Sequence, residues 1–125
     1  MIIETLEGDF SISKLHTSKG IGLSRKMHFV GITDDEISLV CPTRDTPSGT
    51  IEREDGWRGF RIKGTLDFSL TGILSRISAL MADDGIGIFA ISTYNTDYIF
   101  VKDRSFDRSL EILKDNGFKI SEYTV

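Results

Sequence analysis

The stretch from residue 64 to residue 102 constrains the fold most, because it predicts a loop, a helix and two strands without a break. Its apolar residues first recur at the spacing of one helical face, at Ile73, Leu74, Ile77, Leu80 and Met81. This spacing predicts a helix over residues 72–84, which Ser69 or Thr71 would cap and Gly85 would end in a left-handed conformation. A helix with one apolar face needs a sheet or a second helix to cover that face.

Strands are predicted where β-branched and aromatic residues gather, at residues 56–64, 86–93, 98–102 and 118–123. The second and third of these form a hairpin across a polar turn, and Gly59 is a possible bulge in the first. A second helix is predicted to begin at Ser105 as its cap and to end at Asn116 and Gly117. The order β-α-β-β-α-β predicts a ferredoxin-like α+β fold, with two helices on one face of a four-stranded sheet.

The N-terminal part of the chain is predicted to be rich in strands. Residues 9–17 read as a strand, and the apolar runs 27–33 and 36–42 read as a hairpin around a short acidic turn. Residues 42–56 contain both prolines and many turn-forming residues, which predicts a surface connection without regular structure. We therefore expect two parts, a smaller β-rich lobe at residues 1–55 and a second domain at residues 56–125.

Composition excludes several classes of protein. A formal net charge of −4 is unlike the concentrated positive charge of nucleic-acid-binding proteins. The single cysteine, Cys41, allows no internal disulfide and no thiolate metal site, and its apolar surroundings predict burial. No apolar run is long enough to cross a membrane, and the acidic N-terminus lacks the features of a signal peptide. We expect a cytoplasmic protein that holds no metal and no cofactor.

The runs LTGIL, GIGIFAIST and TDYIFVK resemble the corresponding parts of an ACT domain, and the resemblance extends over residues 57–123. It implies a ferredoxin-like ACT domain at residues 56–125, and it makes residues 1–55 similar to a reduced ACT-like lobe of small tandem-ACT proteins. ACT modules pair with one another and bind effectors where two modules meet. The resemblance therefore also implies a homodimer and a regulated enzyme as partner, while the composition argues against membrane and nucleic acid as partners.

The predicted binding site combines the loop after the first ACT strand with a facing strand. In the families that the chain resembles, the regulatory lobes of aspartate kinases and the arginine-sensing ACT proteins, the corresponding residues line the effector pocket. The predicted ligand-binding residues are Asp67, Phe68, Ser69, Leu70, Thr71, Gly72, Ile73, Ala90, Ile91, Ser92 and Thr93. Backbone N–H groups at the helix start can hold the carboxylate of an amino acid, and Asp67 can neutralise its ammonium group.

Two functional interpretations lead at this stage, and a third, a small enzyme, stays open only because a ferredoxin-like pocket can host chemistry without a recognisable motif. The first is a non-catalytic regulatory protein that binds a small amino acid or a related metabolite at an interface between lobes or chains. The alternative is an interaction or dimerisation module that binds no ligand, in which the same loop residues only cap a helix and pack. No catalytic residues are predicted, because neither histidine stands at a spacing typical of a nucleophile or a metal site.

Overall fold

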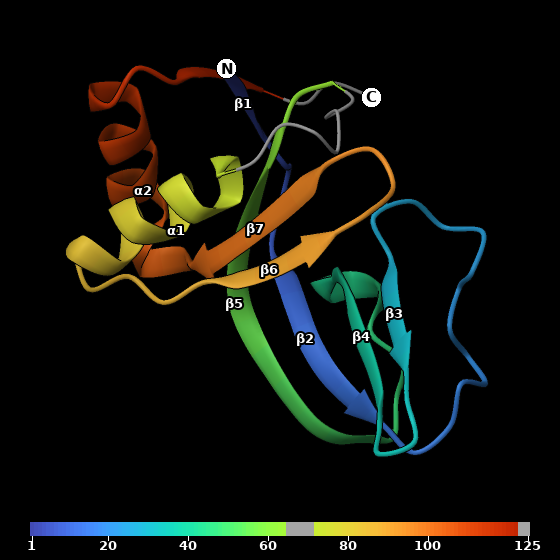
Figure 1. Ribbon diagram of the computed structural model, residues 1–125. Coiled ribbons are helices and arrows are strands. Elements are labelled where there is room, and N and C mark those ends of the chain that lie inside the picture. Colours follow the sequence, from blue (N-terminus) through green and yellow to red (C-terminus); the bar gives the residue numbers. More distant parts are fainter. Residues whose placement is uncertain (65–71, 123–125) are drawn as a thin grey trace. The chain divides into compact units, whose positions relative to one another are not determined.

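The computed structural model describes residues 1–64 and 72–122. The chain forms two compact units (Figure 1). Unit 1 comprises Met1–Glu7 and Arg58–Val125, and unit 2 comprises Gly8–Trp57. The sequence predicted a division after residue 55, but the structure groups the first seven residues with the C-terminal part of the chain. None of the helices in the described ranges is long and apolar enough to cross a membrane.

Unit 1 contains the predicted β-α-β-β-α-β order, which is confirmed. Its elements are the C-terminal half of β5 (Thr50–Ile62), α1 (Ile73–Asp83), β6 (Phe89–Ser92), β7 (Asp97–Lys102), α2 (Asp103–Asp115) and β8 (Lys119–Glu122). The predicted hairpin is present, since β6 and β7 pair antiparallel from Phe89 opposite Phe100 to Ser92 opposite Asp97. β7 pairs on its other side with β5.

An additional strand, β1 (Ile2–Thr5), enlarges the sheet of unit 1 beyond the predicted four strands. β1 pairs antiparallel with β5 and parallel with β8, so it lies between two strands that would otherwise be neighbours. The strand order in unit 1 is therefore β6-β7-β5-β1-β8. Ile3 explains why this position is stable, because its side chain is fully buried in the core of the unit.

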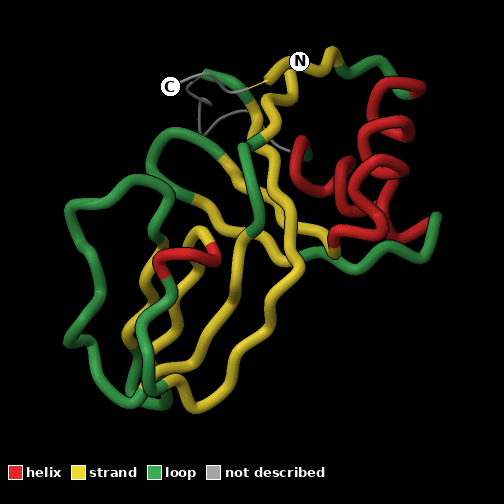
Figure 2. The backbone as a smooth tube through the Cα atoms, turned by 180° about the vertical axis from the view of Figure 1, so that it is seen from behind, coloured by secondary structure: helices red, strands yellow, loops and turns green. Residues whose placement is uncertain are grey.

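The two helices of unit 1 cover one face of its strands, as Figures 1 and 2 show from opposite sides. The core between helices and sheet takes fully buried apolar residues from β1, β5 and β7 and from both helices. Its largest members are Phe60, Ile3, Ile62, Ile77, Met81, Ile99, Leu113 and Val101. The helical periodicity therefore identified the buried face of α1 correctly at Ile77 and Met81.

The opposite face of the same sheet combines apolar packing with a polar cluster. Phe100 is fully buried there and lies so close to Gly59 that a Cβ on the glycine would be 2.7 Å from the ring. Beside it, Nε of Arg61 donates to Glu4 and Nη1 donates to the Tyr98 hydroxyl, each over 2.9 Å. This face therefore carries a fully buried aromatic ring next to a hydrogen-bonded group of Arg61, Glu4 and Tyr98.

The helix ends agree in part with the sequence. Gly85 and Gly117 adopt the left-handed conformation after α1 and α2, with φ of 71° and 93°. The prediction that Ser105 caps α2 is wrong, because the helix begins two residues earlier, directly after Lys102. Asp103 lies in the first turn, where its charge favours the helix dipole.

Unit 2 is a four-stranded antiparallel sheet. It contains β2 (Phe10–Leu15), β3 (Phe29–Ile32), β4 (Ile37–Pro42), the short 3-10 helix η1 (Thr43–Asp45) and the N-terminal half of β5. The predicted hairpin of β3 and β4 is confirmed. The strand order β3-β4-β2-β5 places the second, third, first and fourth strands of the unit side by side, which is the order of a ferredoxin-like sheet.

The prediction that residues 42–56 lack regular structure is wrong. β5 begins at Thr50 and pairs antiparallel with β2 through its charged residues, whose side chains are exposed while their backbone completes the sheet. The pairing shifts between Phe10 and Ile12, opposite Gly56 with its φ of 83°. This irregularity therefore lies at Gly56, and a second one lies between Lys14 and Leu15. A bulge at Gly59 stays a prediction, and the absence of a side chain at this residue allows the close approach of Phe100.

The core of unit 2 contains the only cysteine of the chain. Leu15, Leu39 and Cys41 are buried together, and Cys41 is fully inaccessible to solvent, as predicted. Burial raises the pKa of the Cys41 thiol, although the hydroxyl of Thr46 near its Sγ acts in the opposite direction. The cysteine is therefore a core residue kept in its neutral form.

Candidate functional site

The described part of the predicted site consists of Gly72, Ile73 and the strand residues 90–93. Asp67, Phe68, Ser69, Leu70 and Thr71 lie outside the described residues, as do the predicted caps Ser69 and Thr71. The described residues of the predicted site therefore fall into two groups, the start of α1 and the strand β6 with the turn that follows it.

The start of α1 presents backbone N–H groups that have no acceptor within the helix. Gly72 is the N-cap residue, and its φ of 85° is a left-handed conformation that favours glycine. As a glycine it has no side chain that could cap the helix. The first intrahelical bond joins the Arg76 N–H to the Gly72 carbonyl over 2.8 Å, which leaves the N–H groups before Arg76 without intrahelical acceptors. The first turn contains no acidic residue, so nothing in it neutralises the positive end of the helix dipole.

Gly72 also leaves space in front of this helix start. A Cβ built on Gly72 would meet no described heavy atom within 4 Å. Ile73 is half-buried, and its side chain packs against the core of unit 1. This packing anchors the first turn of α1, while the N–H of Ile73 lies at the start of the helix. The backbone, not the side chains, is thus the chemically useful part of these two residues.

Arg76 fixes the first turn of α1 to the far end of α2. Its Nη2 donates to the Asn116 carbonyl over 2.7 Å, and its guanidinium lies 5.1 Å from the centre of the Phe118 ring. The Asn116 side chain in turn donates to the carbonyl of Ile112 within α2. The positive charge of Arg76 therefore adds to the positive potential at the helix start and holds that turn in place.

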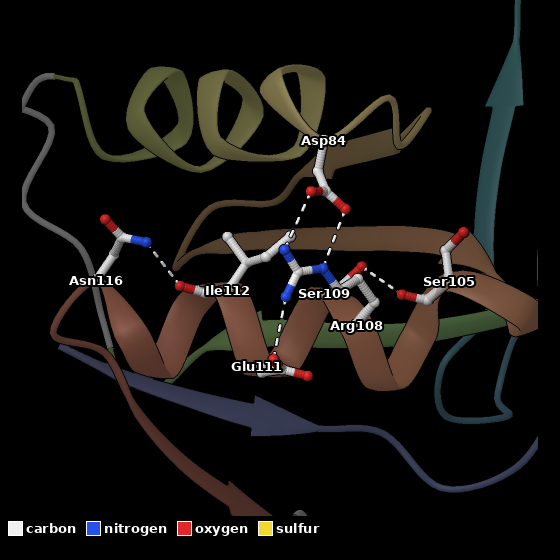
Figure 3. A network of polar contacts seen from close by, with 7 residues as sticks. All are labelled: Asp84, Ser105, Arg108, Ser109, Glu111, Ile112 and Asn116. Carbon is white, nitrogen blue, oxygen red and sulfur yellow. Dashed lines mark hydrogen bonds and ion pairs between the residues drawn. The ribbon is translucent and has the colours of Figure 1, made fainter.

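The other end of α1 is held by a second arginine. Arg108 of α2 donates from Nε and from Nη2 to the two carboxylate oxygens of Asp84, each over 3.1 Å, and from Nη1 to Glu111 (Figure 3). The hydrogen bonds from Arg108 lower the pKa of Asp84, and the same contact raises the pKa of Arg108. Both ends of α1 are thus fixed to α2, which orients the helix start within the unit.

Ala90, Ile91 and Ser92 lie on β6, and Thr93 directly follows it. Among the described strands β6 pairs with β7 alone and forms an edge of unit 1. Ala90 is opposite the core residue Ile99 and therefore faces the helix side, where it is exposed. Ile91 is opposite Tyr98 and points to the other face. Successive side chains of a strand point to opposite faces of the sheet, so the predicted residues of β6 do not all face the same way. Only Ala90 and Ser92 lie on the face that α1 covers.

The hydroxyl groups of Ser92 and Thr93 take part in the turn between β6 and β7. The Ser92 hydroxyl donates to Asp97, while the Thr93 N–H and hydroxyl donate to the Thr96 carbonyl over 2.8 and 3.1 Å. Thr96 itself is buried and donates from its hydroxyl to the Ile62 carbonyl over 2.8 Å. These residues therefore hold the turn between β6 and β7 in shape.

Sequence reasoning missed Arg76 and Thr96. Arg76 could have been noticed as a cation in the first turn of a helix, where cations are unfavourable, which signals a specific partner. Thr96 was treated as part of a polar turn, because nothing in its local sequence indicates burial. No cluster of residues suited to hold a metal ion is present among the described residues.

Comparison with known proteins agrees with this geometry. A family model for the ACT domain matches residues 52–115. A crystal structure of an Agobacterium tumefaciens protein is 26% identical, with a TM-score of 0.84, and the alignment covers 98% of this chain and 93% of that one. No curated protein sequence matched the chain.

Two further solved structures are aspartate kinases. The alpha and beta subunits of an aspartokinase align with a TM-score of 0.67 at 14% identity, over 91% of each chain. An allosteric aspartate kinase of Clostridium acetobutylicum aligns with a TM-score of 0.62 at 11% identity, over 90% of this chain and 33% of the enzyme. At these identities the likeness shows a shared fold alone, while the ACT family itself indicates a regulatory role that involves a small molecule.

Proposed function

Because the chain belongs to the ACT domain family, we propose that it is a non-catalytic regulatory protein that binds a small amino acid or a related metabolite. The observation that carries the proposal is the start of α1, where Gly72 exposes backbone N–H groups and the first turn contains no acidic residue. A carboxylate accepts hydrogen bonds from such groups and is favoured by the helix dipole.

The remaining contacts of the ligand follow from its chemistry. An amino acid also carries an ammonium group, which needs carbonyl, hydroxyl or carboxylate acceptors. Asp67 is proposed as the charged acceptor, and the backbone of β6 at Ala90 and Ser92 as the facing wall. Phe68, Ser69, Leu70 and Thr71 complete the proposed loop, while Ile91 and Thr93 support the strand.

We further propose that unit 2, Gly8–Trp57, is the reduced ACT-like lobe that the sequence predicts at residues 1–55. The order of the strands in unit 2 supports this assignment, since it is the ferredoxin-like order without the two long helices. A ligand that binds one arrangement of lobes or chains more tightly than another shifts the population toward that arrangement. An enzyme partner that prefers the same arrangement then responds to the ligand, and a homodimer is the simplest such assembly.

A thermal-shift screen against the common amino acids tests the proposal first. A ligand that binds only the folded state stabilises it by about 2.7 kcal/mol when its concentration is a hundred times its Kd. A rise in Tm with one amino acid supports a sensor and identifies its effector. The absence of any rise at millimolar concentrations favours the alternative, an interaction module that binds no ligand.

Two glycines at opposite ends of α1 then locate the site. Gly72 and Gly85 both have positive φ, 85° and 71°, and both would carry a Cβ in open space. Gly72→Val and Gly85→Val should therefore lower the Tm by similar amounts, because a β-branched residue is strained at either position. In isothermal titration, Gly72→Val should weaken binding of the amino acid and Gly85→Val should not. Asp67→Ala should also weaken it. Affinity that is unchanged in both Gly72→Val and Asp67→Ala argues against this site.

A further inference from the structure

The buried hydroxyl of Thr96 connects the two segments that border the candidate site. Thr96 is 7% exposed and stands directly before β7, and its Oγ1 donates to the carbonyl of Ile62, the last residue of β5. On the other side of β5, the Lys63 N–H donates to the Ile2 carbonyl over 2.9 Å. The end of β5 is therefore held from both sides, by β1 and by the turn that follows β6.

A second hairpin in the same chain shows what such a turn needs on its own. β3 and β4 in unit 2 have the same lengths and the same spacing as β6 and β7 in unit 1. Both turns begin with a threonine, and in both the threonine N–H bonds to the carbonyl three residues later, from Thr33 to Glu36 over 2.9 Å and from Thr93 to Thr96 over 2.8 Å. The hydroxyl groups of Thr33 and Thr93 bond to the same carbonyls.

The two turns differ at their last residue. In unit 2 this residue is Glu36, which is exposed, whereas in unit 1 it is the buried Thr96. The backbone of Glu36 closes its turn without a buried side chain, so hairpin geometry alone does not require the hydroxyl of Thr96. The bond from Thr96 to Ile62 is therefore an addition in the unit that carries the candidate site.

We propose that Thr96 is a positioning residue of this site, an inference that rests on the proposed function. Its hydroxyl fixes the turn after Ser92 and Thr93 to the end of β5, so that the facing wall keeps a constant position within unit 1. Thr96 does not touch the ligand. It acts by restricting the motion of β6 and the turn that follows it before a ligand binds. The loss of conformational entropy on binding is then smaller.

The first test needs no ligand. Thr96→Val keeps the shape of the side chain but leaves the Ile62 carbonyl without the hydroxyl donor, and Thr96→Ser restores that donor. In hydrogen exchange of the full chain, amides at residues 60–64 and 92–97 should exchange about tenfold faster in Thr96→Val, because one buried hydrogen bond is lost. Thr96→Ser should exchange like the wild type. Wild-type exchange in Thr96→Val would overturn the proposal.

The second test uses whichever of the twenty common amino acids raises the wild-type Tm most. Its Kd should rise about tenfold in Thr96→Val and return toward the wild-type value in Thr96→Ser. Thr33→Val is a control in the other hairpin, because it removes a turn hydroxyl in unit 2 and should lower the Tm without changing the Kd. An unchanged Kd in Thr96→Val would overturn the positioning role. If no amino acid raises the wild-type Tm, the proposed function fails, and the exchange experiment still decides whether Thr96 holds the two segments together.

Discussion

Arg108 and Asp84 form a bidentate ion pair that joins the middle of α2 to the residue after α1, with both hydrogen bonds at 3.1 Å. Its geometry matches the planar fork of the guanidinium to the two carboxylate oxygens. Both side chains are partly open to solvent, so the pair contributes through geometry and not through burial. Its main effect is to fix the end of α1 that lies away from the candidate site.

This ion pair predicts a loss of stability in acid. The pKa of Asp84 is lowered in the folded protein from its usual 3.8, so its contribution is fully present above that value and is lost as the pH falls through the folded pKa. Asp84→Asn should therefore be less stable than the wild type at neutral pH, and this difference should vanish in acid. Urea unfolding at a series of pH values measures both effects.

Asp83→Asn is the control for this prediction, since the neighbouring carboxylate is also exposed. It should follow the acid dependence of the wild type. Arg108→Lys tests the geometry, because lysine keeps the charge but lacks the planar fork. A pH profile of Asp84→Asn that parallels the wild type throughout would contradict the assignment.

Gly59 predicts a large effect from one added methyl group. In Gly59→Ala the new Cβ would lie 2.7 Å from Cε1 of Phe100 and 3.0 Å from Cδ1 of Leu6, both side chains being buried. Overpacking of this kind costs about 1–3 kcal/mol in the free energy of unfolding. Chemical denaturation should show this loss. The double variant Gly59→Ala/Phe100→Leu should lose less stability than the sum of the losses in the two single variants, because the smaller side chain at position 100 makes room for the new methyl group.

Gly87→Ala is the matched control, because its Cβ would have no heavy atom within 4 Å and its φ lies outside the left-handed region. The change at Gly87 should alter stability by less than about 1 kcal/mol. Equal effects at the two glycines would show that Phe100 has room to move, and that its close approach does not require glycine at position 59.

Ile3 predicts that the N-terminal residues are part of the core of unit 1. Its side chain is fully buried beside Ile62, whereas the neighbouring Ile2 is 37% exposed. Ile3→Ala should cost about 2–5 kcal/mol in the free energy of unfolding, while Ile2→Ala should cost much less. Similar small losses in both variants, measured by denaturant unfolding, would mean that β1 contributes little to this unit.

The local elements of unit 1 could be predicted because their signals are contained in short stretches. The apolar face of α1 and the turn between β6 and β7 depend on neighbours in sequence, and both were found. β1 was missed because it has only four residues and its position depends on pairing with β8 at the other end of the chain. The N-terminal half of β5 was missed because its charged side chains are typical of a loop.

The candidate site could be predicted only as a set of residues, not as an arrangement. The sequence indicated the helix start at Gly72, since glycine before an amphipathic helix is a local signal. It could not indicate that Arg76 reaches Asn116, or that Thr96 reaches Ile62, because both contacts join residues that the fold brings together. It also indicated Ser92 and Thr93 as ligand contacts, although their hydroxyls take part in the turn.

Cys41 predicts a thiol that does not react while the protein is folded. The side chain is fully inaccessible, and burial raises the pKa of the thiol, so both access and the thiolate fraction are reduced. An aromatic disulfide reagent such as DTNB should label the native protein far more slowly than the protein in 6–8 M urea, where about one thiol per chain reacts at once. Labelling of the native protein should therefore follow the rate at which unit 2 opens, and it should accelerate with low concentrations of urea. Immediate labelling without denaturant would show that the core around Leu15 and Leu39 is open to solvent, in conflict with their burial.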